Sequence, residues 1–223
     1  MRKHNNSISD KFLNECDRFL KIVANKPEKP TIATPLPSEN NLNEKLAQNF
    51  SYDNKSELKN TQGLMRINHT GEICAQALYY GQAMFAKDET TKKHLIQAAN
   101  EEHNHLYWCQ QRMDELHTHA SILNPFWYAS SFALGATAAL FGDKISYGFV
   151  IEIEKQVEDH LQEHIEQIPK ADSKTHAILQ QMQADEIRHG QDAKNAGGVE
   201  LPQAVKPVMH YMSKFMKFLV YRI

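Results

Sequence analysis

The sequence predicts an all-α protein built around a bundle of four long helices. Four segments carry apolar residues at alternating three- and four-residue steps, the stripe of a helix packed in a bundle. No segment shows the sustained alternation of apolar and polar residues that a half-buried strand requires. The 223 residues include only 9 glycines and 8 prolines, which argues against a turn-rich β-sandwich or barrel.

The first sixty residues are expected to form an arm, followed by one helical domain over residues 61–223. The N-terminus lacks the apolar run of a secretory signal. Residues 12–24 predict one short amphipathic helix. Residues 26–52 then hold four of the eight prolines and many asparagines, a composition typical of a linker.

The four long helices are expected at about 62–87, 88–117, 146–168 and 172–196. Pro169 ends the third of them, and the Gly197-Gly198 pair ends the fourth. Residues 203–221 mix Met, Phe, Val and Lys and predict a further, short C-terminal helix.

An apolar segment separates the two pairs of long helices. Residues 116–142 contain no Asp, Glu, Lys or Arg. Residues 126–142 would reach only ~26 Å as a helix, short of the ~30 Å hydrocarbon core of a bilayer. We expect an interfacial helix with Phe126, Trp127 and Tyr128 at the level of the lipid headgroups. The alternative is a buried crossover helix.

Charge and cysteine content exclude several classes of function. Lys and Arg number 25 against 27 Asp and Glu, for a net charge of −2, so nothing favours nucleic acid as a partner. The three cysteines form no Cys-x-x-Cys pair, which predicts reduced thiols in a cytosolic compartment rather than a disulfide framework. The twelve histidines are the unusual feature of the composition.

Each long helix places a glutamate where the period calls for an apolar residue. These four are Glu72, Glu102, Glu154 and Glu186. One unpaired buried carboxylate costs several kcal/mol or takes up a proton. The stripes carry no Lys or Arg to neutralise four of them, whereas a pair of metal ions would.

The second and fourth helices carry Glu-x-x-His, at Glu102–His105 and Glu186–His189. Residues three apart share one face of a helix, so each carboxylate and imidazole point at the same place. Glu72 precedes Glu102 by 30 residues, and Glu154 precedes Glu186 by 32. The chain therefore reads as two copies of one hairpin. Its four carboxylates and two imidazoles are the set used by di-iron and di-manganese bundles, and they suit Fe or Mn better than structural zinc.

Neighbouring residues offer alternatives and supports. Glu152 and Glu158 compete with Glu154, but they lie off the stripe or at its edge. Asp185 and Glu101 each precede a Glu-x-x-His by one residue, and each is expected to orient the histidine of the opposite helix. Nothing around the His160–His164 pair completes a metal site, so we expect a solvated or supporting role for it. Tyr79 is expected to pack in the core or line a pocket.

Several stretches together resemble the demethoxyubiquinone hydroxylases of ubiquinone biosynthesis. The resemblance covers about Leu64 to Ile223, roughly two thirds of the chain. It rests on LMRINHTGEICAQALYYGQA, EEHNHLYWC, LNPFWYASSFALG, GFVIEIEKQVEDHL and the closing DEIRH. It implies a ferritin-like di-iron monooxygenase. It also implies two iron ions per chain, with Glu102 and Glu186 bridging them, held by Glu72, Glu102, His105, Glu154, Glu186 and His189.

The resemblance implies ring hydroxylation of a demethoxyubiquinol-type polyprenyl quinol with O₂. The substrate tail lies in a bilayer, so the expected place of the protein is the cytoplasmic face of the cell membrane, as a peripheral protein. No glycine-rich dinucleotide fingerprint is present, so electrons come from NADH directly or from a reductase. Other ubiquinone-biosynthesis proteins are further candidate partners. The alternatives are a ferritin-like iron store and a di-iron peroxidase.

Overall fold

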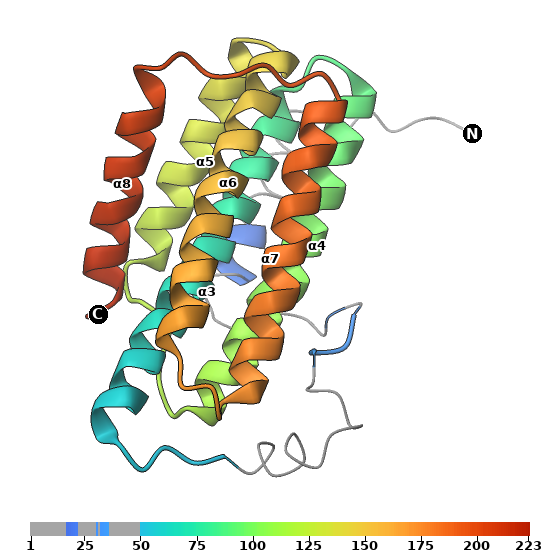
Figure 1. The fold of residues 1–223 in the computed structure, drawn as a ribbon. Helices are drawn as coiled ribbons and strands as arrows, with labels where there is room; N and C mark the ends of the chain where they lie inside the picture. The colour runs from blue at the N-terminus through green and yellow to red at the C-terminus, as the bar shows by residue number, and fades with distance from the viewer. Residues whose placement is uncertain (1–16, 22–29, 31, 36–49) are drawn as a thin grey trace.

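The computed structural model describes residues 17–21, 30, 32–35 and 50–223, and all regular secondary structure within them is helical (Figure 1). Residues 17–21 form a short helical segment; the rest of the helix expected at 12–24 lies outside the described residues. The labelled helices are α3 (Lys55–Phe85), α4 (Glu89–Glu115), α5 (Asn124–Leu140), α6 (Asp143–Gln167), α7 (Ser173–Asn195) and α8 (Val205–Val220). The all-α prediction is confirmed.

The bundle consists of two helical hairpins, α3 with α4 and α6 with α7. Figure 1 shows the four long helices running side by side, with α8 at one edge and α4 and α7 at the other. Helix α5 leads from the first hairpin to the second and packs along α3. The repeat seen in the sequence is therefore a repeat of the fold.

Helix starts follow polar caps. Asp88 accepts hydrogen bonds from the Thr90 and Thr91 amides at 3.1 Å, and Asp172 accepts one from the Thr175 amide at 3.1 Å. The start expected for the first long helix was wrong. Asn54 accepts from the Ser56 amide at 2.9 Å, so α3 begins at Lys55 and takes in residues that the sequence assigned to the arm.

Two glycines let α5 approach α3 closely. A Cβ atom at Gly81 would lie 2.2 Å from the Phe132 carbonyl oxygen, and one at Gly135 would lie 2.1 Å from the Leu78 carbonyl oxygen. Only residues without a side chain fit such backbone contact. One face of α5 is therefore a buried part of the fold.

The expected placement of the three α5 aromatics was wrong for two of them. Phe126 is 60% exposed, but Trp127 and Tyr128 are only 9% and 4% exposed. Trp127 packs with Ile67 and Val220, because α3 and α8 cover that face of α5. Among the described residues no helix is long and apolar enough to cross a membrane.

Apolar side chains are also exposed on α8. We call them, together with the exposed apolar side chains in and beside α5, the α5–α8 apolar surface. The two helices meet where the Trp127 ring approaches the Phe215 ring at 6.5 Å between centroids. The exposed members are Ile122, Phe126, Leu140 and Phe141 in and beside α5, and Val208, Tyr211, Met212, Phe215 and Phe218 on α8. Exposed apolar side chains gathered on two helices that meet in this way favour an interaction surface.

Among the described residues, two apolar clusters draw on all four long helices. One contains Met65, Trp108, Leu161 and Met182; the other contains Tyr79, Leu95, Val150 and Ala193, among others. On every long helix the stripe glutamate falls between its contributions to the two clusters. The four stripe glutamates thus form a polar layer, which lies between these two apolar clusters.

Candidate metal centre

All six residues expected to hold metal come together in this polar layer. Glu72 comes from α3, Glu102 and His105 from α4, Glu154 from α6, and Glu186 and His189 from α7. Each of the six is at most 5% exposed. The helical period places one carboxylate per helix toward the axis, and the Glu-x-x-His spacing adds an imidazole on α4 and on α7.

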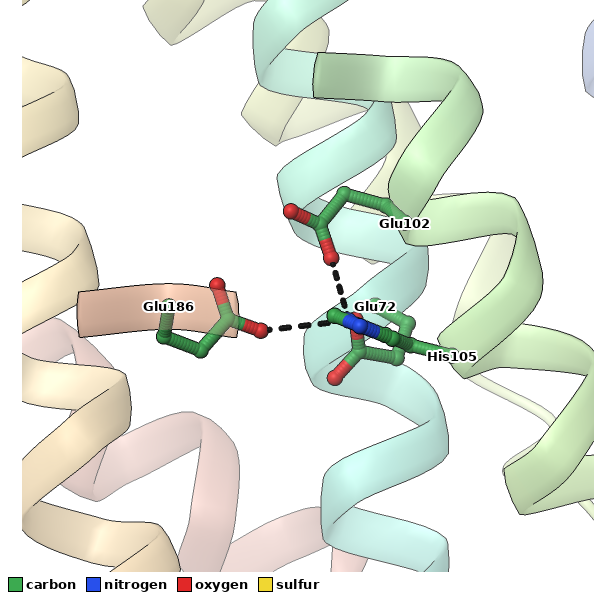
Figure 2. A group of neighbouring side chains, drawn as sticks. All are labelled: Glu72, Glu102, His105 and Glu186. Carbon is green, nitrogen blue, oxygen red and sulfur yellow. Dashed lines mark hydrogen bonds and ion pairs between the residues drawn. The ribbon is translucent and has the colours of Figure 1, made fainter. Parts of the chain in front are cut away.

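The six side chains form two overlapping groups. Glu72, Glu102, His105 and Glu186 are one group, and Glu102, Glu154, Glu186 and His189 are the other; the ligand atoms within each lie within 4.8 Å of one another. Glu102 and Glu186 belong to both. Figure 2 shows the first group, in which His105 Nδ1 faces Glu102 at 2.9 Å and Glu186 at 3.3 Å.

The protein supplies too few partners for these carboxylates. Within the part of the chain that the structure describes, neither Glu154 oxygen has a hydrogen-bond partner, nor does Glu102 Oε1. His189 Nδ1 approaches Glu102 Oε1 at 3.0 Å, yet without the geometry of a hydrogen bond. Buried carboxylate oxygens without donors are the atoms that a cation would neutralise, so the residues fit a metal pair.

The pKa values show the same charge imbalance. Burial, reinforced by the Glu102 and Glu186 charges, raises the pKa of Glu72 well above its usual range. Burial and the Glu186 charge do the same to the pKa of Glu154. Burial opposes a charged His189, but the carboxylates of Glu102 and Glu186, at 3.0 and 3.5 Å from its Nδ1, prevail and raise its pKa to about 12. Without metal, protons on these groups neutralise the layer.

The two histidines are oriented by carboxylates of the opposite helix, as predicted. His105 Nε2 lies 3.1 Å from Asp185 Oδ2, and His189 Nε2 lies 2.8 Å from Glu101 Oε2. Arg188 donates to both of these outer carboxylates at 3.1 and 3.0 Å. With Nε2 occupied, each imidazole presents Nδ1 to the carboxylates in the layer.

Glu154 is buried, whereas Glu152 lies 3.7 Å from Lys206 in an ion pair, and this difference favours Glu154 over Glu152. The solvated alternative for the His160–His164 pair was wrong, because both side chains are buried. The supporting role stays a prediction. His164 Nδ1 lies 2.7 Å from Asn68 Oδ1, and burial lowers the pKa of His164 to about 3.

A cavity of about 420 Å³ opens beside His189. It lies between α4 and α7, and Tyr79 contributes to its lining. The Tyr79 hydroxyl has no hydrogen-bond partner. Tyr79 therefore both packs in the core and lines a pocket, the two alternatives expected for it. The rest of the lining was not indicated by the sequence, because it includes small residues such as Ala98, Ala193 and Ala196 on two distant helices.

A buried cluster of four carboxylates and two imidazoles in a four-helix bundle defines the class of ferritin-like dimetal carboxylate proteins. Comparison with known proteins narrows this class. The family model described as "Ubiquinone biosynthesis protein COQ7" matches residues 59–219. The chain belongs to this family of ubiquinone biosynthesis proteins.

Several relatives carry the name 3-demethoxyubiquinol 3-hydroxylase. The protein from Ralstonia pickettii (strain 12J) is 46% identical over 217 residues, which cover 96% of this chain and 99% of the relative. The protein from Polynucleobacter necessarius subsp. necessarius (strain STIR1) is 52% identical over 168 residues, covering 75% and 80% of the two chains. The protein from Francisella philomiragia is 44% identical over 216 residues, covering 97% and 98%.

We predict that metal binding releases protons and tightens as pH rises from about 6 to 8. The metal-free histidines hold protons because their pKa values are raised, and a metal takes the neutral imidazole. Calorimetric titration with Mn²⁺ in buffers of different ionisation enthalpy should show about two or more protons released per chain. The Glu102→Ala variant serves as the control with an impaired site. An affinity independent of pH, with no proton release, would contradict the assigned ligands.

Proposed function

We propose that this chain is a di-iron monooxygenase that hydroxylates the ring of a demethoxyubiquinol-type polyprenyl quinol. The observation that carries the proposal is the pair of ligand groups sharing Glu102 and Glu186. Glu72 and His105 complete one metal position, and Glu154 and His189 complete the other. The activity follows the name of the relatives, which this chain matches over nearly its whole length.

A bound pair of reduced iron ions supplies the chemistry that activates O₂. The overall reaction consumes O₂, two electrons and two protons; one oxygen atom replaces a ring hydrogen as a hydroxyl, and the other leaves as water. The chain has to keep bulk water away from this reaction and to hold the metal ligands in fixed orientations. The apolar clusters above and below the layer exclude bulk water, and Asp185 and Glu101 keep both imidazoles aligned.

The α5–α8 apolar surface supports a peripheral position on the cytoplasmic face of the cell membrane. A quinol with a polyprenyl tail resides in the bilayer, so its enzyme must reach the lipid surface. Exposed Phe215 and Phe218 on α8 and Phe126 on α5 can enter the headgroup region, with Arg222 at the end of α8 near anionic lipid. The opposite edge of the bundle carries the cavity between α4 and α7, and the donor of electrons is NADH or a reductase.

We predict that the chain restores ring hydroxylation in cells that lack this activity and accumulate a demethoxy quinone. Grown under ¹⁸O₂, such cells should form a product whose new hydroxyl carries ¹⁸O, measured by mass spectrometry of the extracted lipids. Glu154→Ala at matched expression should form none, because one metal position loses its carboxylate. Glu152→Ala removes a carboxylate two residues away on the same helix, one that pairs with Lys206; it is the matched control and should remain active.

The same experiment separates the rival functions. An iron store would consume O₂ without labelling any lipid, and a peroxidase would need no O₂. Oxygen drawn from H₂¹⁸O rather than ¹⁸O₂ would contradict oxygen insertion from O₂.

We predict that the triple variant Phe126→Ser, Phe215→Ser, Phe218→Ser loses binding to vesicles of phosphatidylethanolamine and phosphatidylglycerol. These three side chains are each more than half exposed, so the fold and iron content should persist while lipid partition falls at least tenfold, as judged by co-sedimentation. Ile187→Ser removes an exposed apolar side chain from α7 instead and should bind like the wild type. Equal vesicle binding by the triple variant and the wild type would refute this membrane surface.

A further inference from the structure

The two halves of the metal centre differ in what supports their histidines. Three residues after His105 stands Trp108, which is 1% exposed, and its ring lies 5.1 Å from the imidazole of His105 between centroids. The matching position after His189 is Asp192, which borders the open cavity. The imidazole of His105 therefore packs against the Trp108 indole, whereas the imidazole of His189 borders the cavity.

The N-terminal arm covers Trp108 from outside. By the arm we mean the described residues 17–21, 30 and 32–35. The Trp108 indole N–H donates to the Ile32 carbonyl oxygen at 3.3 Å. Two further contacts fix the same stretch to α4: the Ile32 amide donates to Asn104 Oδ1 at 3.4 Å, and the Thr34 hydroxyl donates to Gln111 Oε1 at 2.6 Å. Asn104, Trp108 and Gln111 occupy successive turns of one face of α4.

A second anchor places the arm over the helices that carry Glu72 and His105. The Phe19 ring meets the Tyr128 ring edge-on at 5.3 Å and packs with Ile73 and Leu106. Ile73 follows Glu72 in the chain, and Leu106 follows His105. The contacts given for the described arm residues thus fall on α3, α4 and α5, beside the residues that follow Glu72 and His105.

We infer that Trp108 is a positioning residue for His105 and that the arm, through Ile32 and Thr34, holds Trp108 in place. The arm then sets the affinity of the metal position formed by Glu72, Glu102, His105 and Glu186. This inference rests on the proposed two-iron centre. The matched family model begins at residue 59, so the arm adds to a centre that the family domain already contains.

The indole acts through geometry rather than as a ligand. Both nitrogens of His105 are engaged, Nδ1 toward Glu102 and Nε2 toward Asp185. The ring can still tilt about the line that joins its two nitrogens, and packing against Trp108 has to limit this tilt. A flat, nearly fully buried ring with its N–H tied to the arm limits this motion. Outer residues that orient a ligand typically change metal affinity about 10- to 100-fold.

The test follows anaerobic release of Fe²⁺ to a ferrous chelator from the full-length, iron-loaded chain. Trp108→Phe removes the N–H, and Thr34→Val removes the contact of the arm with Gln111. Trp127→Phe changes the other tryptophan, which packs between α5 and α8, and is the matched control. We expect half of the iron to leave about tenfold faster in Trp108→Phe, a smaller change of the same kind in Thr34→Val, and release like the wild type in Trp127→Phe.

A role in folding alone would give a different result. Both halves of the iron would then leave faster in proportion to the loss of thermal stability, and this outcome overturns the inference, as does unchanged release in Trp108→Phe. Faster release in Trp108→Phe with no change in Thr34→Val would overturn the role of the arm. Wild-type and Trp127→Phe chains that hold fewer than two ions would instead overturn the two-iron centre itself, and this inference with it.

Discussion

The fold has to neutralise four carboxylates that are buried in one layer of a helical bundle. Like charges in a medium of low dielectric repel strongly, and each loses its hydration on burial. Two imidazoles offset part of this charge, yet both oxygens of Glu154 still lack a partner. The layer is therefore stable only with bound cations or with added protons. Burial raises the pKa of Glu72, and the Glu102 charge outweighs burial and raises the pKa of His105, so both shifts favour the protonated forms.

The surrounding architecture serves this layer. Each glutamate sits between two apolar clusters, which place apolar side chains on two sides of the carboxylates. The paired hairpins give the centre an approximate symmetry, in which Asp185 supports the histidine of α4 and Glu101 supports that of α7. Three features break this symmetry. Helices α5 and α8 add an apolar surface on one side of the bundle, and the cavity lies between α4 and α7. The arm contacts α4 beside His105.

The metal residues were accessible to sequence reasoning because charge on an apolar stripe is costly, so Glu72 and Glu154 stood out from their neighbours. The carboxylates that orient His105 and His189 followed from the repeat. Other features depend on contacts between distant segments. The burial of Trp127 comes from α3 and α8, and the burial of His164 comes with a hydrogen bond to Asn68 on another helix. The early start of α3 had a local signal, the Asn54 cap, which the apolar period alone did not reveal.

We infer that two iron ions bind between these six side chains. Crystals of the iron-loaded chain, measured with X-rays on either side of the iron absorption edge, test this directly. We expect two anomalous peaks within the bundle, one bounded by Glu72 and His105 and the other by Glu154 and His189, with Glu102 and Glu186 between them. A single peak, or iron bound elsewhere with the layer still protonated, would contradict the two-iron centre.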